Sequence, residues 1–194
     1  MLSSSQRLSA ADHAFGFFVT AAMYFGSYSL VLLIIEPAQH MLNPTSIFYG
    51  YLIFLPHGIR ILTIWLYGFW GAAYLLPVVV LTSAVYQPEF EITWPIILLA
   101  SISITSAVVS FAICRAAGLL LRLAEAAKST WRDLLIVGSV AAALNAFLHW
   151  LVLPSASSLD FSAIFVGDIL GLILMLALMM ISYRFLRKLS NLVL

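Results

Sequence analysis

Apolar stretches long enough to cross a membrane follow one another along the chain, separated by short segments rich in polar residues, proline or glycine. A helix of about 20 apolar residues, rising about 1.5 Å per residue, spans a hydrocarbon core about 30 Å thick. The pattern predicts an all-α, polytopic transmembrane helix bundle of about six spans, forming a single integral membrane domain over residues 1–194. The expected spans cover about 15–35, 47–66, 70–86, 94–114, 134–153 and 164–183.

Local sequence sets two of these boundaries. Glu36-Pro37 is expected to end the first apolar run, because proline has no backbone N–H to continue a helix. Between Ile47 and Tyr86 the chain is apolar for about forty residues, which is enough for two spans. The aromatic and glycine-rich stretch Trp65–Gly71 is the expected turn, since Trp and Tyr favour the membrane interface and glycine permits a tight turn. A re-entrant segment within 47–86 is the alternative.

Composition supports a membrane protein and excludes several other classes. With 63% hydrophobic and 9% charged residues, the chain has too few polar side chains to cover a soluble globule. The apolar run after Met1–Asp12 is longer than the core of a signal peptide, so we expect a retained first span. A formal net charge of +1, without a basic and aromatic patch, gives no indication of a nucleic-acid partner. The single Cys114 excludes an internal disulfide.

The distribution of Lys and Arg predicts the orientation in the membrane. The segment Arg115–Arg132, typical of a helical extension or interfacial helix, and the C-terminal tail together carry seven of the nine basic residues. The segments 36–44, 87–93 and 154–160 carry none. Because cytoplasmic loops are enriched in Lys and Arg, we expect both termini on the cytoplasmic side of a bacterial inner membrane.

A polar and helix-breaking sequence interrupts the second predicted span. Pro56, His57, Gly58 and Arg60 lie about ten residues from its outer end, near the middle of the bilayer. Proline and glycine together predict that this span is broken at Pro56–Gly58. An arginine at the centre of a membrane helix costs about 2.5–3.5 kcal/mol, so Arg60 is expected to have a partner within the protein.

The fifth and sixth spans supply polar residues at a similar depth. Asp168 lies one to two turns into the sixth span, and Asn145 and His149 are four residues apart on one face of the fifth. We therefore expect Arg60 to pair with Asp168, while His57, Asn145 and His149 complete a hydrogen-bonded network.

Small residues predict where helices approach each other closely. Gly167 and Gly171 are four residues apart and flank Asp168, so this face of the sixth span is expected to contact another helix. The fourth span is rich in Ser and Thr, which we interpret as small polar residues that allow close helix packing or bond to the helix's own carbonyls.

The polar cluster admits more than one role. It is either a buried salt bridge that fixes helix register, or a pocket open to the outside in which Arg60 would receive an anion, or His57 and His149 would respond to pH. The outer-half histidines, His40 included, match no standard metal-ligand spacing, so no metal or other cofactor is predicted. No Ser/His/Asp spacing or nucleophile elbow indicates an enzyme, and no catalytic residue is predicted.

Two motifs resemble the first class of membrane-associated sensor (MASE) domains of bacteria. They are Phe54-Leu55-Pro56-His57-Gly58-Ile59, followed by the turn at Trp65–Gly71, and Gly167-Asp168-Ile169-Leu170-Gly171. The resemblance implies an integral membrane sensor. Domains of that family usually have about eight spans and precede a cytoplasmic kinase or diguanylate cyclase domain, whereas this chain has about six and stops at Leu194. A short relative of this kind is expected to signal through a partner.

The leading hypothesis is therefore a sensory or ligand-binding membrane module, surrounded by the lipid bilayer. It would act through another membrane protein or a cytoplasmic signalling protein in signal transduction. The first alternative is a small membrane transporter or substrate-binding component, in which the broken second span lines a path. The second is a non-catalytic accessory subunit of a membrane complex, in which the faces of small residues serve assembly.

Overall fold

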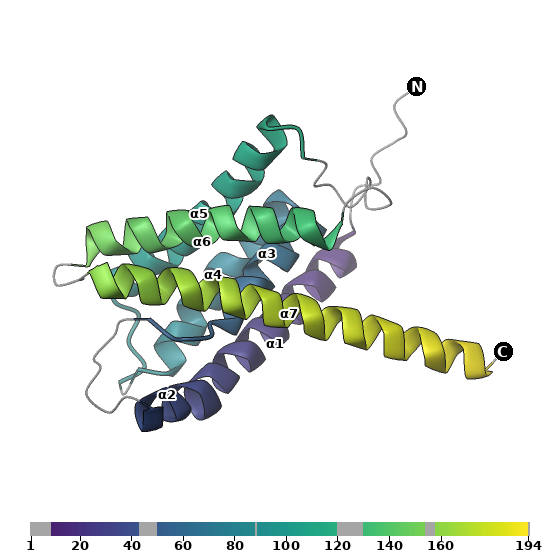
Figure 1. Ribbon diagram of the computed structural model, residues 1–194, viewed down its shortest axis with the longest axis horizontal. Coiled ribbons are helices and arrows are strands. Elements are labelled where there is room, and N and C mark those ends of the chain that lie inside the picture. Colours follow the sequence, from purple (N-terminus) through teal and green to yellow (C-terminus); the bar gives the residue numbers. More distant parts are fainter. Residues whose placement is uncertain (1–8, 43–49, 88, 120–129, 154–157, 194) are drawn as a thin grey trace.

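The computed structural model describes residues 9–42, 50–87, 89–119, 130–153 and 158–193, and these ranges contain helices but no strand. The predicted all-α bundle is confirmed (Figure 1). The elements are α1 (Ala10–Leu30), the π-helical turn η1 (Val31–Ile35), α2 (Glu36–Leu42), α3 (Leu55–Tyr67), α4 (Phe69–Val85), α5 (Trp94–Ala116), α6 (Trp131–Val152) and α7 (Ser158–Val193).

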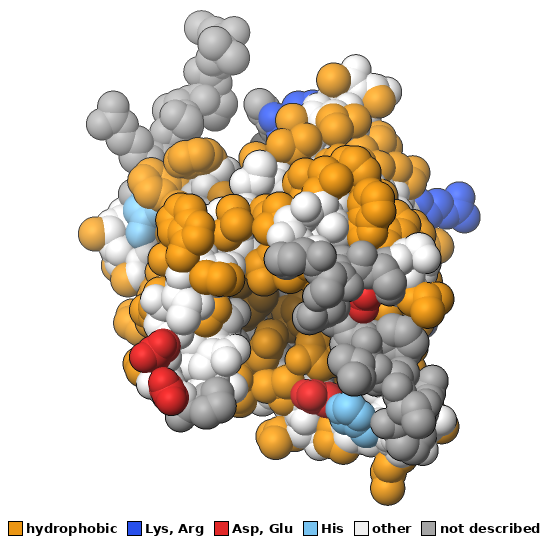
Figure 2. Space-filling model, turned by 90° about the vertical axis from the view of Figure 1, so that its left-hand side faces the viewer, with side chains coloured by type: hydrophobic (Ala, Val, Ile, Leu, Met, Phe, Trp, Pro, Cys, Tyr) orange, Lys and Arg blue, Asp and Glu red, His pale blue; other side chains and the backbone are white. Residues whose placement is uncertain are grey.

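The distribution of side chains is that of a membrane protein. Four helical segments are long and apolar enough to cross a bilayer, namely Ala10–Leu42, Trp94–Ala116, Trp131–Val152 and Ser158–Phe185, and Phe69–Val85 is a shorter apolar helix. Large apolar side chains cover much of the surface in Figure 2, while Arg60 is only 1% exposed. Apolar side chains therefore face outward, while Arg60 within the bundle is enclosed, as lipid requires.

Helix α3 lies at the centre of the bundle. It packs against α1, α4, α5, α6 and α7. Every residue from Leu55 to Ile64 is buried, which leaves no lipid-facing side on this part of the helix. Figure 1 shows α6 and α7 side by side, with the C-terminal part of α7 projecting beyond the other helices.

Several helix ends differ from the sequence prediction for local reasons. Helix α6 begins at Trp131, about three residues early, because Thr130 and Asp133 form a capping box, with the Thr130 backbone N–H donating to the Asp133 carboxylate over 2.6 Å. Helix α7 extends beyond the predicted 164–183 at both ends. Residues 120–129, which hold most of the predicted interfacial helix, lie outside the described residues.

The prediction that Glu36-Pro37 ends the first helix is wrong. The helical path continues through Pro37 to Leu42, because the π-helical turn Val31–Ile35 comes immediately before it. A proline ring clashes with the carbonyl four residues earlier in a regular α-helix, and a wider turn with one extra residue relieves that clash.

The predicted break at Pro56–Gly58 is also wrong. Helix α3 is continuous and begins at Leu55, so Pro56 lies in its first turn, where a missing N–H costs nothing. Gly58 is helical, and a Cβ there would come within 2.5 Å of Met175 Cβ on α7. At the other end, Gly68 (φ 59°) connects α3 to α4 within the stretch predicted as a turn. That α3 and α4 make two full crossings stays a prediction.

The irregular part of the second predicted span is the non-helical segment 50–54, which lies along α7. Gly50 contacts the backbone of Ala163 and Ile164. A Cβ at Gly167 or Gly171 would overlap the carbonyl oxygens of this segment. Gly167 thus makes room for extended backbone rather than for a helix, whereas Gly171 also lies against the start of α3, because its Cβ position is 2.8 Å from the Leu55 backbone nitrogen.

A side chain and a helix carbonyl bond to three backbone groups of this segment. The Phe54 N–H donates to the Gly167 carbonyl oxygen over 2.8 Å. Both polar atoms of the Gln39 amide bond to this segment. Its Nε2 donates to the Gly50 carbonyl oxygen (3.3 Å), and its Oε1 accepts from the Leu52 N–H (2.9 Å). Non-helical backbone within a membrane protein is tolerated where the protein supplies such partners or where it lines a water-filled cavity.

We predict that Gly171→Ala destabilises the protein more than a glycine substitution elsewhere. The added methyl overlaps the Phe54 carbonyl, and overpacking of this kind costs about 1–3 kcal/mol. Thermal unfolding in detergent measures the effect. Gly26→Ala on α1 is the control, because nothing lies within 4 Å of its Cβ position. Equal unfolding temperatures for the two variants would contradict the close approach of the segment to α7.

Candidate ligand-binding site

The five predicted polar residues come together between three helices. His57 and Arg60 lie in the first turns of α3, Asn145 and His149 on α6, and Asp168 on α7. His57, Arg60 and Asp168 are each 1% exposed, so all three are buried within the bundle. The continuous burial of α3 explains why a histidine and an arginine three residues apart are both enclosed.

Arg60 holds the Asp168 carboxylate through one long contact. Its Nη2 lies 3.5 Å from Asp168 Oδ1 and 3.3 Å from His57 Nδ1. Its Cζ lies 5.5 Å from the centroid of the Phe54 ring, within cation–π range. The Nε atom of Arg60 is buried without a hydrogen-bond partner. The pair is thus not the short, two-bond fork that guanidinium and carboxylate can form, and Asp168 keeps part of its bonding capacity.

His57 is oriented by a bond across to α6. Its Nε2 lies 3.0 Å from the Gly138 carbonyl oxygen, which can only accept, so Nε2 carries the proton. Nδ1 then accepts from the Arg60 guanidinium in the neutral ring. The 3.3 Å contact between Nδ1 and Asp168 Oδ2 becomes a hydrogen bond only when one of these two atoms is protonated.

Asn145 links Asp168 to α6 and leaves one oxygen unused. Its Nδ2 donates to Asp168 Oδ2 over 2.7 Å. Its Oδ1 is buried and has no hydrogen-bond partner, although Asn145 is only 4% exposed. His149 Nδ1 donates to the Asn145 backbone oxygen over 2.9 Å, one helical turn away. An unpaired buried acceptor costs about 1–3 kcal/mol, so a ligand that donates a hydrogen bond to this oxygen would recover that free energy.

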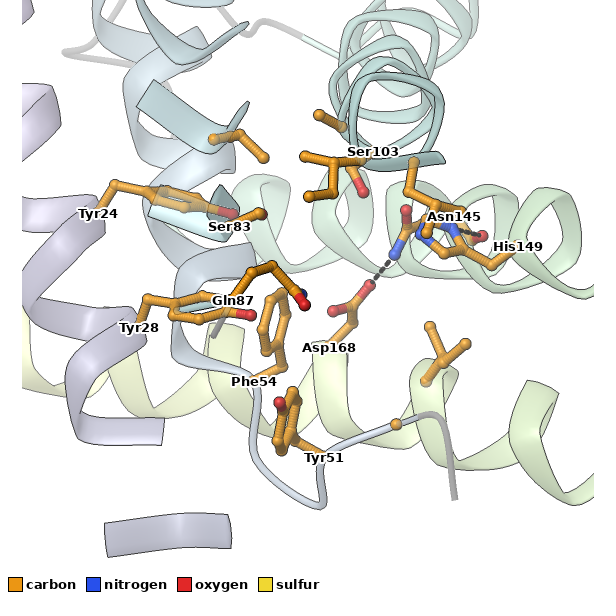
Figure 3. A pocket seen from close by; sticks show the side chains of 16 residues that line it. Tyr24, Tyr28, Tyr51, Phe54, Ser83, Gln87, Ser103, Asn145, His149 and Asp168 are labelled. Carbon is orange, nitrogen blue, oxygen red and sulfur yellow. Dashed lines mark hydrogen bonds between the residues drawn. The ribbon is translucent and has the colours of Figure 1, made fainter. Parts of the chain in front are cut away.

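A cavity of about 260 Å³ lies beside these groups. Asp168, Asn145 and His149 form one side, and Figure 3 shows the Asp168 carboxylate between the Asn145 amide and a set of aromatic rings. The other labelled lining residues come from α1, the segment 50–54, α4, the residues after it and α5: Tyr24, Tyr28, Tyr51, Phe54, Ser83, Gln87 and Ser103.

The structure divides the five predicted residues into two groups. Asp168, Asn145 and His149 line the cavity, whereas His57 and Arg60 contact Asp168 but do not line the cavity. An anion entering the cavity would meet the Asp168 carboxylate rather than the Arg60 guanidinium. This geometry does not favour the hypothesis that Arg60 receives an anion.

Sequence reasoning missed the aromatic wall of the cavity. Tyr24 and Tyr28 are four residues apart on α1, a spacing that places them on one face, but it does not say which face lines a cavity. Tyr51 and Phe54 lie on the segment that was predicted to be helical, so their stacking (5.8 Å, 8°) was not foreseeable. Ser103 lines the cavity, whereas Ser101, Ser106 and Ser110 bond to carbonyls of their own helix.

Among the described residues, no group of three or more His, Cys, Asp or Glu side chains is placed to hold a metal ion. Comparison of the chain with protein-family models, with curated proteins and with solved structures gives no match. The function therefore has to be argued from the geometry of the cavity and the polar network.

We predict that Arg60 and Asp168 are energetically coupled. Arg60→Ala and Asp168→Ala should each lower stability in detergent by about 3–5 kcal/mol, because each leaves a buried charge without its partner. The double variant should cost clearly less than the sum of the two. Unfolding of all four proteins measures this cycle, and strict additivity would refute the pairing.

Proposed function

We propose that this chain is an integral membrane sensory or ligand-binding module that recognises a small molecule and acts through a partner. The observation that carries the proposal is the cavity of about 260 Å³, which is lined by Asp168 and by Asn145, whose Oδ1 is buried without a hydrogen-bond partner. A bridge that only fixed helix register would need neither a cavity nor an unused acceptor.

The position of the cavity supports access from outside the cell. Its lining includes Gln87 just after α4, Ile96 near the start of α5, His149 near the end of α6 and Ile164 near the start of α7. These positions share one end of the bundle, where the connecting segments contain no Lys or Arg. Figure 2 looks onto this end and shows a central hollow. By the distribution of basic residues, it is the external end.

The same network offers a route by which binding would reach a partner. Asp168 joins α7 to Arg60 on α3 and to Asn145 on α6, so a ligand that bonds to Asp168 redistributes contacts among three helices. Helix α7 then runs on past the other helices toward the end of the chain that carries Arg184, Arg187 and Lys188 (Figure 1). The motifs that resemble membrane-associated sensor domains, around Pro56 and Asp168, are those that build this network.

We predict that a cysteine placed in the cavity reacts from the outside. In a Cys114→Ala background, Ser103→Cys should react with a membrane-impermeant thiosulfonate applied to intact spheroplasts, on the order of tenfold faster than Ser106→Cys. Ser103 lines the cavity, whereas Ser106 lies on the same helix, is 1% exposed and does not line it. Mass spectrometry of the purified variants measures the labelling. Equal and slow labelling of both cysteines would contradict a cavity open to the outside.

A small transporter is the second candidate, and one observation favours it. The non-helical segment 50–54 contributes Gly50, Tyr51 and Phe54 to the cavity wall, as unwound segments line substrate sites in transporters. Liposomes containing the purified protein distinguish the two proposals. Uptake of a ligand that binds would favour transport, whereas binding without uptake favours the sensory module.

A further inference from the structure

We propose that the cavity binds a small organic cation, a protonated amine whose ammonium group bonds to Asp168 and Asn145 and whose apolar part lies among the aromatic rings. This inference rests on the proposed ligand-binding function and names the chemical class of the ligand. At about 260 Å³ the cavity is below the about 300–1,000 Å³ of sites for drug-sized molecules, so the amine is small.

Two oxygen atoms at the polar end of the cavity can accept a further hydrogen bond. Asn145 Oδ1 is buried, unpaired and part of a residue that lines the cavity. Asp168 Oδ1 has its only described bond from Arg60 at 3.5 Å, the longest in the network. A carboxylate oxygen accepts two hydrogen bonds, so capacity for another donor remains there. An ammonium group carries three N–H donors and no acceptor, which matches this pair of oxygens.

The opposite side of the cavity is a wall of aromatic rings. Tyr24 and Tyr28 stack at 6.5 Å, and Phe54 meets Tyr28 edge to face at 6.1 Å. Tyr51 stacks on Phe54 at 5.8 Å, and both come from the segment 50–54. Ring faces attract cations, and groups of aromatic side chains are a recurring means of binding ammonium ligands. Arg60 already lies over the ring of Phe54, so this wall contacts one cation within the fold.

The acidic side chains around the entrance of the cavity also favour a cationic ligand over an anionic one. Glu36 begins α2, Glu89 and Glu91 lie between α4 and α5, and the segments 36–44, 87–93 and 154–160 contain no Lys or Arg. The face in Figure 2 shows acidic side chains spread around the hollow. A surface that carries charge of one sign raises the local concentration of ligands with the opposite charge. The buried Arg60 does not line the cavity, so an anion would meet carboxylates both at the entrance and at the bottom.

Three compounds of similar shape and different charge test the assignment on the purified full-length protein. The probes are 2-phenylethylamine, 2-phenylethanol and phenylacetate, measured by isothermal titration and by the shift in thermal unfolding in detergent at low salt. The amine should bind at least about tenfold more tightly than the alcohol, since a hydrogen bond to a charged group contributes more than one between neutral groups. Phenylacetate should not bind measurably.

Two variants connect the binding to the residues. Asn145→Leu should weaken the amine about tenfold or more. Tyr28→Leu removes one ring and should weaken the amine as well, and it keeps the test valid if Asn145→Leu does not fold. Tyr67→Leu is the control, because this half-buried tyrosine lies at the opposite end of α3 and does not line the cavity. Its affinity for the amine should equal that of the unchanged protein.

The outcomes separate this inference from the function on which it rests. Equal or tighter binding of the alcohol or of phenylacetate overturns the amine assignment while leaving a ligand-binding cavity in place. Binding of the amine that Tyr28→Leu and Asn145→Leu leave unchanged also overturns it, since the amine would then bind elsewhere. Absence of binding by all three probes, together with equal labelling of Ser103→Cys and Ser106→Cys, overturns both proposals.

Discussion

The requirement that every buried backbone group find a partner inside the protein governs the arrangement of this bundle. The segment 50–54 enters the bundle without helical hydrogen bonds, so its buried backbone groups need partners elsewhere in the protein. Its partners come from outside the segment, from the Gly167 carbonyl and from the Gln39 amide. Glycine at 167 and 171 allows the backbone to lie close enough to α7 for the first of these bonds. The start of α3 is therefore fixed against α7.

The position of the start of α3 against α7 also brings Arg60 close to Asp168. His57 and Arg60 follow within two turns of Leu55, and Asp168 lies between the two glycines that hold the segment. The same backbone contact thus sets the distance between the guanidinium and the carboxylate. The guanidinium and the carboxylate are 3.5 Å apart, and Arg60 Nε is unpaired. The packing of the surrounding helices therefore positions these groups as much as their own hydrogen bonds do.

The association of the five polar residues could be predicted from the sequence because burial of charge in a membrane is costly. Arg60 near the centre of an apolar run needed a partner, and Asp168 was the acidic residue at a comparable depth. The apolar pattern predicted the bounds of α5 to within about two residues, whereas the start of α6 is about three residues earlier because of its capping box. The extended segment was not predictable, because Ile47–Leu55 is apolar enough for a helix, and only tertiary contacts with α7 and Gln39 make the extended form favourable. Because two rings of the aromatic wall belong to that segment, the wall could not be predicted from the sequence either.

The π-helical turn at Val31–Ile35 lets one helical rod present two different faces. One residue added to a helix turns everything after it by about 100° around the axis. Tyr24 and Tyr28, before the turn, line the cavity, while Gln39, after it, bonds to the backbone of Gly50 and Leu52. In a regular α-helix, Gln39 would fall about 20° from Tyr28 around the axis, on the cavity side. The local widening that accommodates Pro37 therefore acts as a rotational offset, which separates the part of the rod that surrounds the cavity from the part that supports its wall.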